Sequence, residues 1–158
     1  TKEYQVIIFK HCFPVSNIQP DLDIPDINSE IKTLANYKLQ YTALRDKLHE
    51  FDETKFIVFT GAAQVRQRIS ETEAFRANEF FTWVVDEWDI PGDNIFIWDF
   101  YNLETEGELY LPDRYAFSAT DSHPNGVFAE TVAPLLVNRI TDIMENNGTA
   151  THNSGQFK

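Results

Sequence analysis

The stretch "KFIVFTG", from Lys55 to Gly61, decides the fold of this chain. It is a short apolar run, rich in β-branched and aromatic residues, and it ends at a glycine. Such runs are typical of strands that are buried on both faces. "YQVIIF" (Tyr4–Phe9) lies before it, "NIFIWDF" (Asn94–Phe100) lies after it, and both have the same character. The sequence therefore predicts three buried strands.

Helical patterns separate and follow these strands. A first helical period begins at about Ser29, and a hydroxyl at Ser70 or Thr72 can cap a second helix. A third helix follows His123, with Pro134 inside it, which predicts a kink or a restart. The apolar stripes of the three helices are Tyr37, Tyr41, Leu44, Leu48 and Phe51; Ala77, Phe80, Phe81, Val84, Val85 and Trp88; and Phe128, Val132, Leu135, Leu136, Ile140 and Ile143.

Strands that alternate with amphipathic helices indicate a parallel sheet with helices on both faces. We therefore predict an α/β fold of three layers, α/β/α, of the flavodoxin-like kind. Residues 1–145 form its single domain, and residues 146–158 form a polar tail. Sheets usually contain about five or six strands, so three predict a fold that is incomplete at the N-terminus. We expect the missing segment, or another chain, to pair with the open edge.

Composition excludes several classes of protein. Apolar residues make up 42% of the 158 residues, enough for a packed core. Asp and Glu number 25 against 13 Lys and Arg, and the resulting charge of −12 repels nucleic acid. No apolar run approaches the roughly 18 residues that a membrane span needs. Cys12 is the only cysteine, so an internal disulfide is impossible. A single cysteine does not indicate whether the protein resides in an oxidising or a reducing compartment.

The segment "TDSHPNG" (Thr120–Gly126) concentrates possible chemistry before the last predicted helix. A histidine such as His123 moves protons near neutral pH, and a carboxylate such as Asp121 can orient it. Ligand sites of parallel sheets lie in loops at the carboxyl ends of the strands, where this loop is expected. In the competing interpretation, Asp121 or Ser122 only caps the helix, and His123 is an exposed loop residue.

The block "YLPDRYAFSATDSHPNGVFAETVAPLLVNRI" resembles the C-terminal block of the SGNH hydrolases, the GDSL-like esterases and lipases. "YQVIIFKHCFPVSNI" is similar to the middle strand and loop of some members, and the two later strands also fit. The resemblance covers most of this chain but only about the last two-thirds of a usual family domain. It implies that His123 is the catalytic base and that Asp121 orients it. It also implies that Asn17, in the loop after the first strand, donates to the oxyanion.

The chain departs from the family pattern at three places. Asp121 stands two residues before His123, where the family usually has a spacing of three. The Gly-Asp-Ser nucleophile block is absent, which implies a serine outside this sequence. The Gly-x-Asn-Asp block is absent too, so ordinary turn chemistry at Ser16-Asn17 remains an alternative to the oxyanion role.

The resemblance implies hydrolysis of an ester, such as an acyl group on a carbohydrate or a lipid, without a metal or organic cofactor. The substrate would be a small-molecule or carbohydrate ester. Two alternatives remain: a non-catalytic SGNH-like binding module, and an unrelated doubly wound domain that binds a small ligand. We expect Cys12 to be a small buried residue rather than the partner of His11, because adjacent residues of an extended segment point opposite ways. On its charged helix, His49 is expected to be exposed.

Overall fold

A parallel three-stranded sheet forms the centre of the protein. The structure, a computed structural model, describes residues 4–22 and 24–149. The strands β1 (Val6–Lys10), β2 (Lys55–Phe59) and β3 (Ile95–Trp98) lie in the order β1-β2-β3. All neighbours are parallel, with Ile8 beside Ile57 and Ile57 beside Phe96. The three predicted strands and their parallel arrangement are confirmed.

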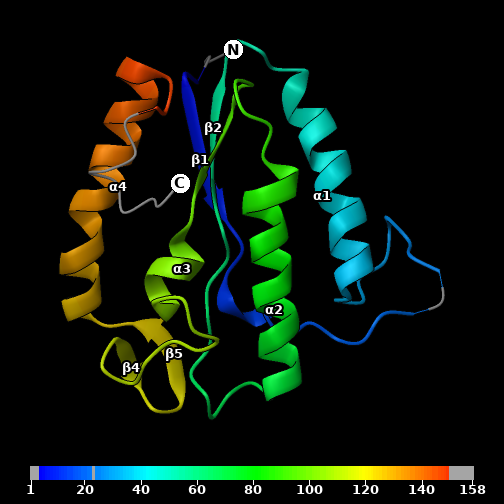
Figure 1. The fold of residues 1–158 in the computed structure, drawn as a ribbon, viewed down its shortest axis with the longest axis vertical. Coiled ribbons are helices and arrows are strands. Elements are labelled where there is room, and N and C mark those ends of the chain that lie inside the picture. The colour runs from blue at the N-terminus through cyan, green and yellow to red at the C-terminus, as the bar shows by residue number, and fades with distance from the viewer. Residues whose placement is uncertain (1–3, 23, 150–158) are drawn as a thin grey trace.

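Helices cover both faces of this sheet (Figure 1). On one face lie α1 (Leu34–His49) and α2 (Glu71–Trp83), and on the other lies α4 (Gly126–Asn146). A short helix, α3 (Phe100–Thr105), follows β3. The mixed α/β class predicted from the sequence is thereby confirmed. Of the predicted polar tail, residues 150–158 lie outside the described residues.

The first two helices begin at hydroxyl caps. The Thr33 hydroxyl accepts the Asn36 amide at 3.2 Å, so α1 begins at Leu34, several residues after the predicted start near Ser29. For α2 the cap is Ser70, which forms a reciprocal capping box with Glu73. The sequence had left Ser70 and Thr72 as alternatives, and the structure selects Ser70.

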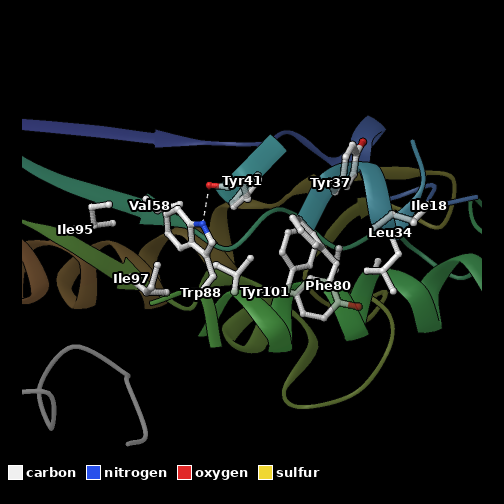
Figure 2. Packing of buried hydrophobic residues seen from close by; sticks show 14 of the residues in the cluster. Ile18, Leu34, Tyr37, Tyr41, Val58, Phe80, Trp88, Ile95, Ile97 and Tyr101 are labelled. Carbon is white, nitrogen blue, oxygen red and sulfur yellow. Dashed lines mark hydrogen bonds between the residues drawn. The ribbon is translucent and has the colours of Figure 1, made fainter. Parts of the chain in front are cut away.

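A cluster of aromatic and aliphatic residues fills the space between the sheet and the helices α1 and α2 (Figure 2). A π-helical turn, Val84–Trp88, extends α2 and brings Trp88 into this cluster with none of its surface exposed. The Trp88 indole N–H donates to the Tyr41 carbonyl oxygen at 2.7 Å, so its polar atom is satisfied inside the core. The predicted apolar stripe therefore continues past the α-helix proper.

A second cluster lies on the opposite face, under α4. Val132 and Ile143 of α4 pack there with Ile57 and Trp98 of the sheet. The helix is continuous through Pro134, so the predicted restart does not occur. Pro134 is exposed, and on that side water can satisfy the carbonyl that a proline leaves without a donor. Among the described residues, no helix is both long and apolar enough to cross a membrane.

Two parts of the sequence-based prediction are wrong. The first strand is not buried on both faces, because β1 lies at the edge of the sheet and leaves Ile7 and Ile8 38% and 40% exposed. The segment before α4 is also not a simple loop. It forms an antiparallel pair, β4 (Ala116–Ser118) and β5 (Asp121–Pro124). Strands of three and four residues are too short to show a period in the sequence.

Candidate active site

Asp121 and His123 form a hydrogen-bonded pair on β5. Residues two apart in a strand point to the same face, and so the spacing of two brings the side chains together. His123 Nδ1 lies 2.6 Å from Asp121 Oδ1, and the His123 backbone amide donates to the same oxygen at 3.0 Å. The backbone amide, and then the ring, hold the pKa of Asp121 below its usual value. The His123 side chain stays 65% exposed, so its ring is open to a reactant.

A different residue caps the following helix. Asn125 Oδ1 accepts the Phe128 amide at 3.1 Å, and the Asn125 side-chain amide donates to the carbonyl oxygens of Arg114 and Ala116. The interpretation in which Asp121 or Ser122 caps α4 is therefore wrong. Asn125 ties the helix to the β4–β5 pair, while the Asp121 carboxylate is left to His123.

Ser122, between the two members of the pair, faces the interior. It is buried, and its hydroxyl oxygen accepts the Val65 amide at 3.1 Å. Val65 ends the segment that follows β2, residues 60–65, which we call the strand-end loop. Gly61 in this loop has a φ of +24°, and a Cβ there would lie 1.9 Å from the Phe81 ring. Glycine is required at this position, because any side chain would displace the loop from α2.

The strand-end loop also connects His123 with Asn17. Gln64 donates from Nε2 to Asn17 Oδ1 at 2.6 Å and to the Phe13 carbonyl oxygen at 3.1 Å. The Phe13 ring contacts the His123 ring edge-on, with centroids 4.9 Å apart. Phe13 and Asn17 both follow β1, so the structure brings Asn17 and His123 to the same end of the sheet. That end is the one at which the three parallel strands have their carboxyl ends.

The Asn17 side chain also influences the titration of Glu73. The pKa of Glu73 lies below its usual value, mainly through the Ser70 hydroxyl, and hydrogen bonding from the Asn17 side chain contributes. An oxyanion role would use the side-chain NH2 group of Asn17, whose amide oxygen is held by Gln64.

The neighbouring residues His11 and Cys12 point apart. His11 Nδ1 lies 3.4 Å from the Tyr41 hydroxyl, and burial lowers the pKa of this histidine. Cys12 is exposed, so the expectation that it is buried is wrong. It follows β1, which lies at the edge of the sheet formed by the described residues. Within residues 4–22 and 24–149, no three His, Cys, Asp or Glu side chains gather as metal ligands would.

The sequence analysis missed several buried polar residues of this region, among them Gln64, Glu104 and Ser122. A signal existed for Gln64, because "TGAAQ" (60–64) places small residues directly after a buried strand, where a chain turns closely over a site. Glu104 gives no such signal, since it stands alone in a stretch without a period. Ser122 was considered only as a helix cap, because its strand could not be recognised.

Comparisons of the chain with models of protein families, with curated proteins and with solved structures found no match.

Proposed function

We propose that this chain carries the histidine and aspartate of an SGNH-type Ser-His-Asp ester hydrolase, with the serine supplied from outside the sequence. The single observation that carries the proposal is the Asp121–His123 pair, 2.6 Å between Oδ1 and Nδ1, at the carboxyl ends of a parallel sheet. This is the place at which open α/β sheets bind ligands. The acyl-ester substrate, on a carbohydrate or a lipid, rests on the family resemblance of the sequence.

The geometry assigns separate tasks to the two residues. The Asp121 carboxylate accepts a hydrogen bond from His123 Nδ1. This contact favours the tautomer of His123 that carries its proton on Nδ1, and it makes Nε2 the basic nitrogen. His123 Nε2 would take the proton of the serine hydroxyl as that oxygen attacks the ester carbonyl, and would then return it to the leaving alcohol. Asp121 stabilises the imidazolium that forms in between. Asn17 would donate from its side-chain NH2 group to the oxyanion, a contact worth about 3 kcal/mol where it is pre-set.

The exposed edge of β1 can pair with an additional strand that carries the nucleophilic serine. Within the described ranges, β1 pairs only with β2, and its outer backbone groups are open to another strand. Ile7 and Ile8 point to opposite faces of the sheet, and both are partly exposed. An added strand and its connections would cover apolar surface on both faces. A strand that paired with β1 in parallel would end beside Lys10 and the loop that follows it. In that loop, Phe13 contacts His123, so a serine at the end of the added strand would lie close to the base.

Ser16 and Ser122, the two buried serines near the candidate site, do not fit the role of nucleophile. Ser16 is buried and donates its hydroxyl hydrogen to the Ala62 carbonyl oxygen, and Ser122 is buried against Val65. We therefore expect residues 1–158 alone to show no turnover of p-nitrophenyl acetate and no labelling by a fluorophosphonate. Stoichiometric labelling of Ser16, Ser118 or Ser122 would contradict the proposal.

The decisive experiment compares two histidine variants in the complete polypeptide that the gene encodes. His123→Ala should lower kcat for the ester by at least about 10³-fold, because the general base is lost. The matched control is His49→Ala, which removes a second His–Asp pair of the described residues and should leave kcat unchanged. An unchanged kcat in His123→Ala would overturn the proposal.

The burial of Ser16 and Ser122, both hydrogen-bonded to the strand-end loop, favours a second candidate, the non-catalytic binding module. A polypeptide that binds an acetylated sugar with a measurable Kd, but neither hydrolyses esters nor reacts with the fluorophosphonate, would support it.

A further inference from the structure

Glu104, on the last turn of α3, is the most unusual polar residue of the structure. None of its surface is exposed. Its Oε2 accepts the Ala63 amide of the strand-end loop at 2.7 Å, whereas Oε1 is buried and has no hydrogen-bond partner among the described residues. A buried carboxyl oxygen without a partner costs free energy, more so when the group is charged. Because burying this carboxyl group destabilises the fold, we expect a role that requires it.

The atoms that Glu104 holds are those that arrange the candidate site. The amide that it binds belongs to Ala63, one residue before Gln64 and two before Val65. Gln64 fixes Asn17 and the Phe13 carbonyl, and Val65 fixes Ser122, which lies between Asp121 and His123. A shift of the strand-end loop at Ala63 therefore moves both sides of the site together.

We infer that Glu104 is a positioning residue, whose buried carboxyl group holds the strand-end loop so that Asn17 and His123 face a common reactant. The importance of this position for catalysis rests on the proposed function; the coupling of the loop to Glu104 does not. A neutral carboxyl has one oxygen to accept the Ala63 amide, and burial of the other oxygen costs less than burial of a charge. Ionisation would place a buried negative charge under the loop and favour its opening.

The surroundings of Glu104 agree with a neutral group at pH 7. Burial raises its pKa from 4.5 to about 8, and the Ala63 amide and the Lys10 ammonium offset only part of this shift. Lys10, from β1, is the cation that faces it, and its Nζ lies 4.9 Å from the centre of the Phe100 ring. Tyr101 of α3 also faces Glu104, and Asp99 lies near that tyrosine.

The test follows the carboxyl carbon of Glu104 and the nearby amides by NMR between pH 6 and 9.5. In the wild-type chain, the carboxyl carbon, the amides of Ala63 and Val65, and the side-chain amide of Asn17 should share one midpoint near pH 8. Glu104→Gln keeps an oxygen that can accept the Ala63 amide and should abolish this midpoint, while its spectrum at pH 7 stays close to that of the wild type. Glu108→Gln, at an exposed position three residues beyond α3, is the control and should keep the midpoint.

Each outcome decides the inference. No midpoint in this range, or a midpoint that survives in Glu104→Gln, would overturn it. A midpoint seen at Ala63 but not at Val65 or Asn17 would overturn it as well, since Glu104 would then be only a local anchor. In an ester-hydrolysing form, Glu104→Gln should remove the loss of kcat above pH 8 and leave KM unchanged. Absence of hydrolysis would count against the proposed function and would leave the NMR result intact.

Discussion

Two His–Asp pairs of nearly equal geometry lie at opposite ends of the sheet. At the carboxyl ends of the strands, His123 Nδ1 and Asp121 Oδ1 are 2.6 Å apart, and at the amino ends His49 Nε2 and Asp93 Oδ2 are 2.7 Å apart. His49 ends α1, and Asp93 stands just before β3. The contact distance therefore does not distinguish a structural pair from a candidate catalytic one.

Exposure and place in the fold do distinguish them. The side chains of His49 and Asp93 are 34% and 14% exposed, against 65% and 38% for His123 and Asp121. Asp93 also accepts the Ile95 amide at 2.8 Å, so it fastens the start of β3 as well as the end of α1. The expectation that His49 is exposed is wrong, because this pairing half-buries it. A partly buried pair between two elements stabilises the fold, whereas an exposed pair at the carboxyl ends is available to a ligand.

The largest effect that we expect concerns Glu104, which lies at the carboxyl ends of the strands and makes the free energy of unfolding depend on pH. Its pKa is raised from 4.5 to about 8 in the folded state. Below pH 4.5 the carboxyl is neutral in both states. As the pH rises from 4.5 to 8, the unfolded state loses the proton first, so wild-type stability falls by up to roughly 1.4 kcal/mol per unit of pKa shift. Glu104→Gln should therefore gain several kcal/mol over the wild type between pH 5 and pH 9.

Urea denaturation of both chains at pH 5, 7 and 9 measures this gain. Glu108→Gln, at an exposed position, should differ from the wild type by the same small amount at each pH. A constant difference between Glu104→Gln and the wild type would show that the carboxyl does not titrate in this range.

The second prediction compares the two histidines by stability. His49→Ala should lower the free energy of unfolding by about 1–2 kcal/mol, because it leaves the largely buried Asp93 without its partner. His123→Ala should change it by no more than about 0.5 kcal/mol, as is usual for exposed positions. Urea unfolding at pH 7 measures both. Equal losses would remove the distinction between a structural pair and an exposed one.

The third prediction separates the helix cap from the pair. Asn125→Ala should cost about 1 kcal/mol, since the first turn of α4 loses the acceptor of its Phe128 amide. Asp121→Ala should cost less than Asn125→Ala, because this exposed carboxylate holds only the neighbouring His123 and caps no helix. Thermal and urea unfolding of the two variants give the comparison. A larger loss in Asp121→Ala than in Asn125→Ala would restore the capping interpretation.

The smallest effect concerns the titration of Asp121. Its pKa is lowered by the His123 amide first and by the ring second. A carboxyl group with a lowered pKa loses its contact only as the pH falls through the lowered value. The Asp121–His123 pair should therefore persist below pH 3.8, the ordinary pKa of an aspartate. His123→Ala removes only the ring, so the pKa should rise part of the way to 3.8. Carboxyl-carbon NMR measures the titration of Asp121 in both chains. An unchanged midpoint in His123→Ala would show that the ring contact is not formed in solution.

The sequence by itself determined the main elements of this protein. Apolar runs such as "KFIVFTG" and stripes such as that of α4 carry the period of a buried strand or an amphipathic helix, and that period is local information. Ser70 was readable as a cap for the same reason, since the cap and the amides that it accepts lie within one turn. The spacing of Asp121 and His123 could also be interpreted locally once β5 was known to be a strand.

Tertiary structure alone decided what surrounds these elements. Whether β1 lies at the edge or in the middle of the sheet depends on which strands pair with it, so its exposed Ile7 and Ile8 and the exposed Cys12 after it could not be predicted. Glu104 and Ala63 meet across 41 residues, and Ser122 and Val65 across 57. Contacts over such separations leave no periodic trace in the sequence, because they arise only when the packed sheet brings its strand-end loops together.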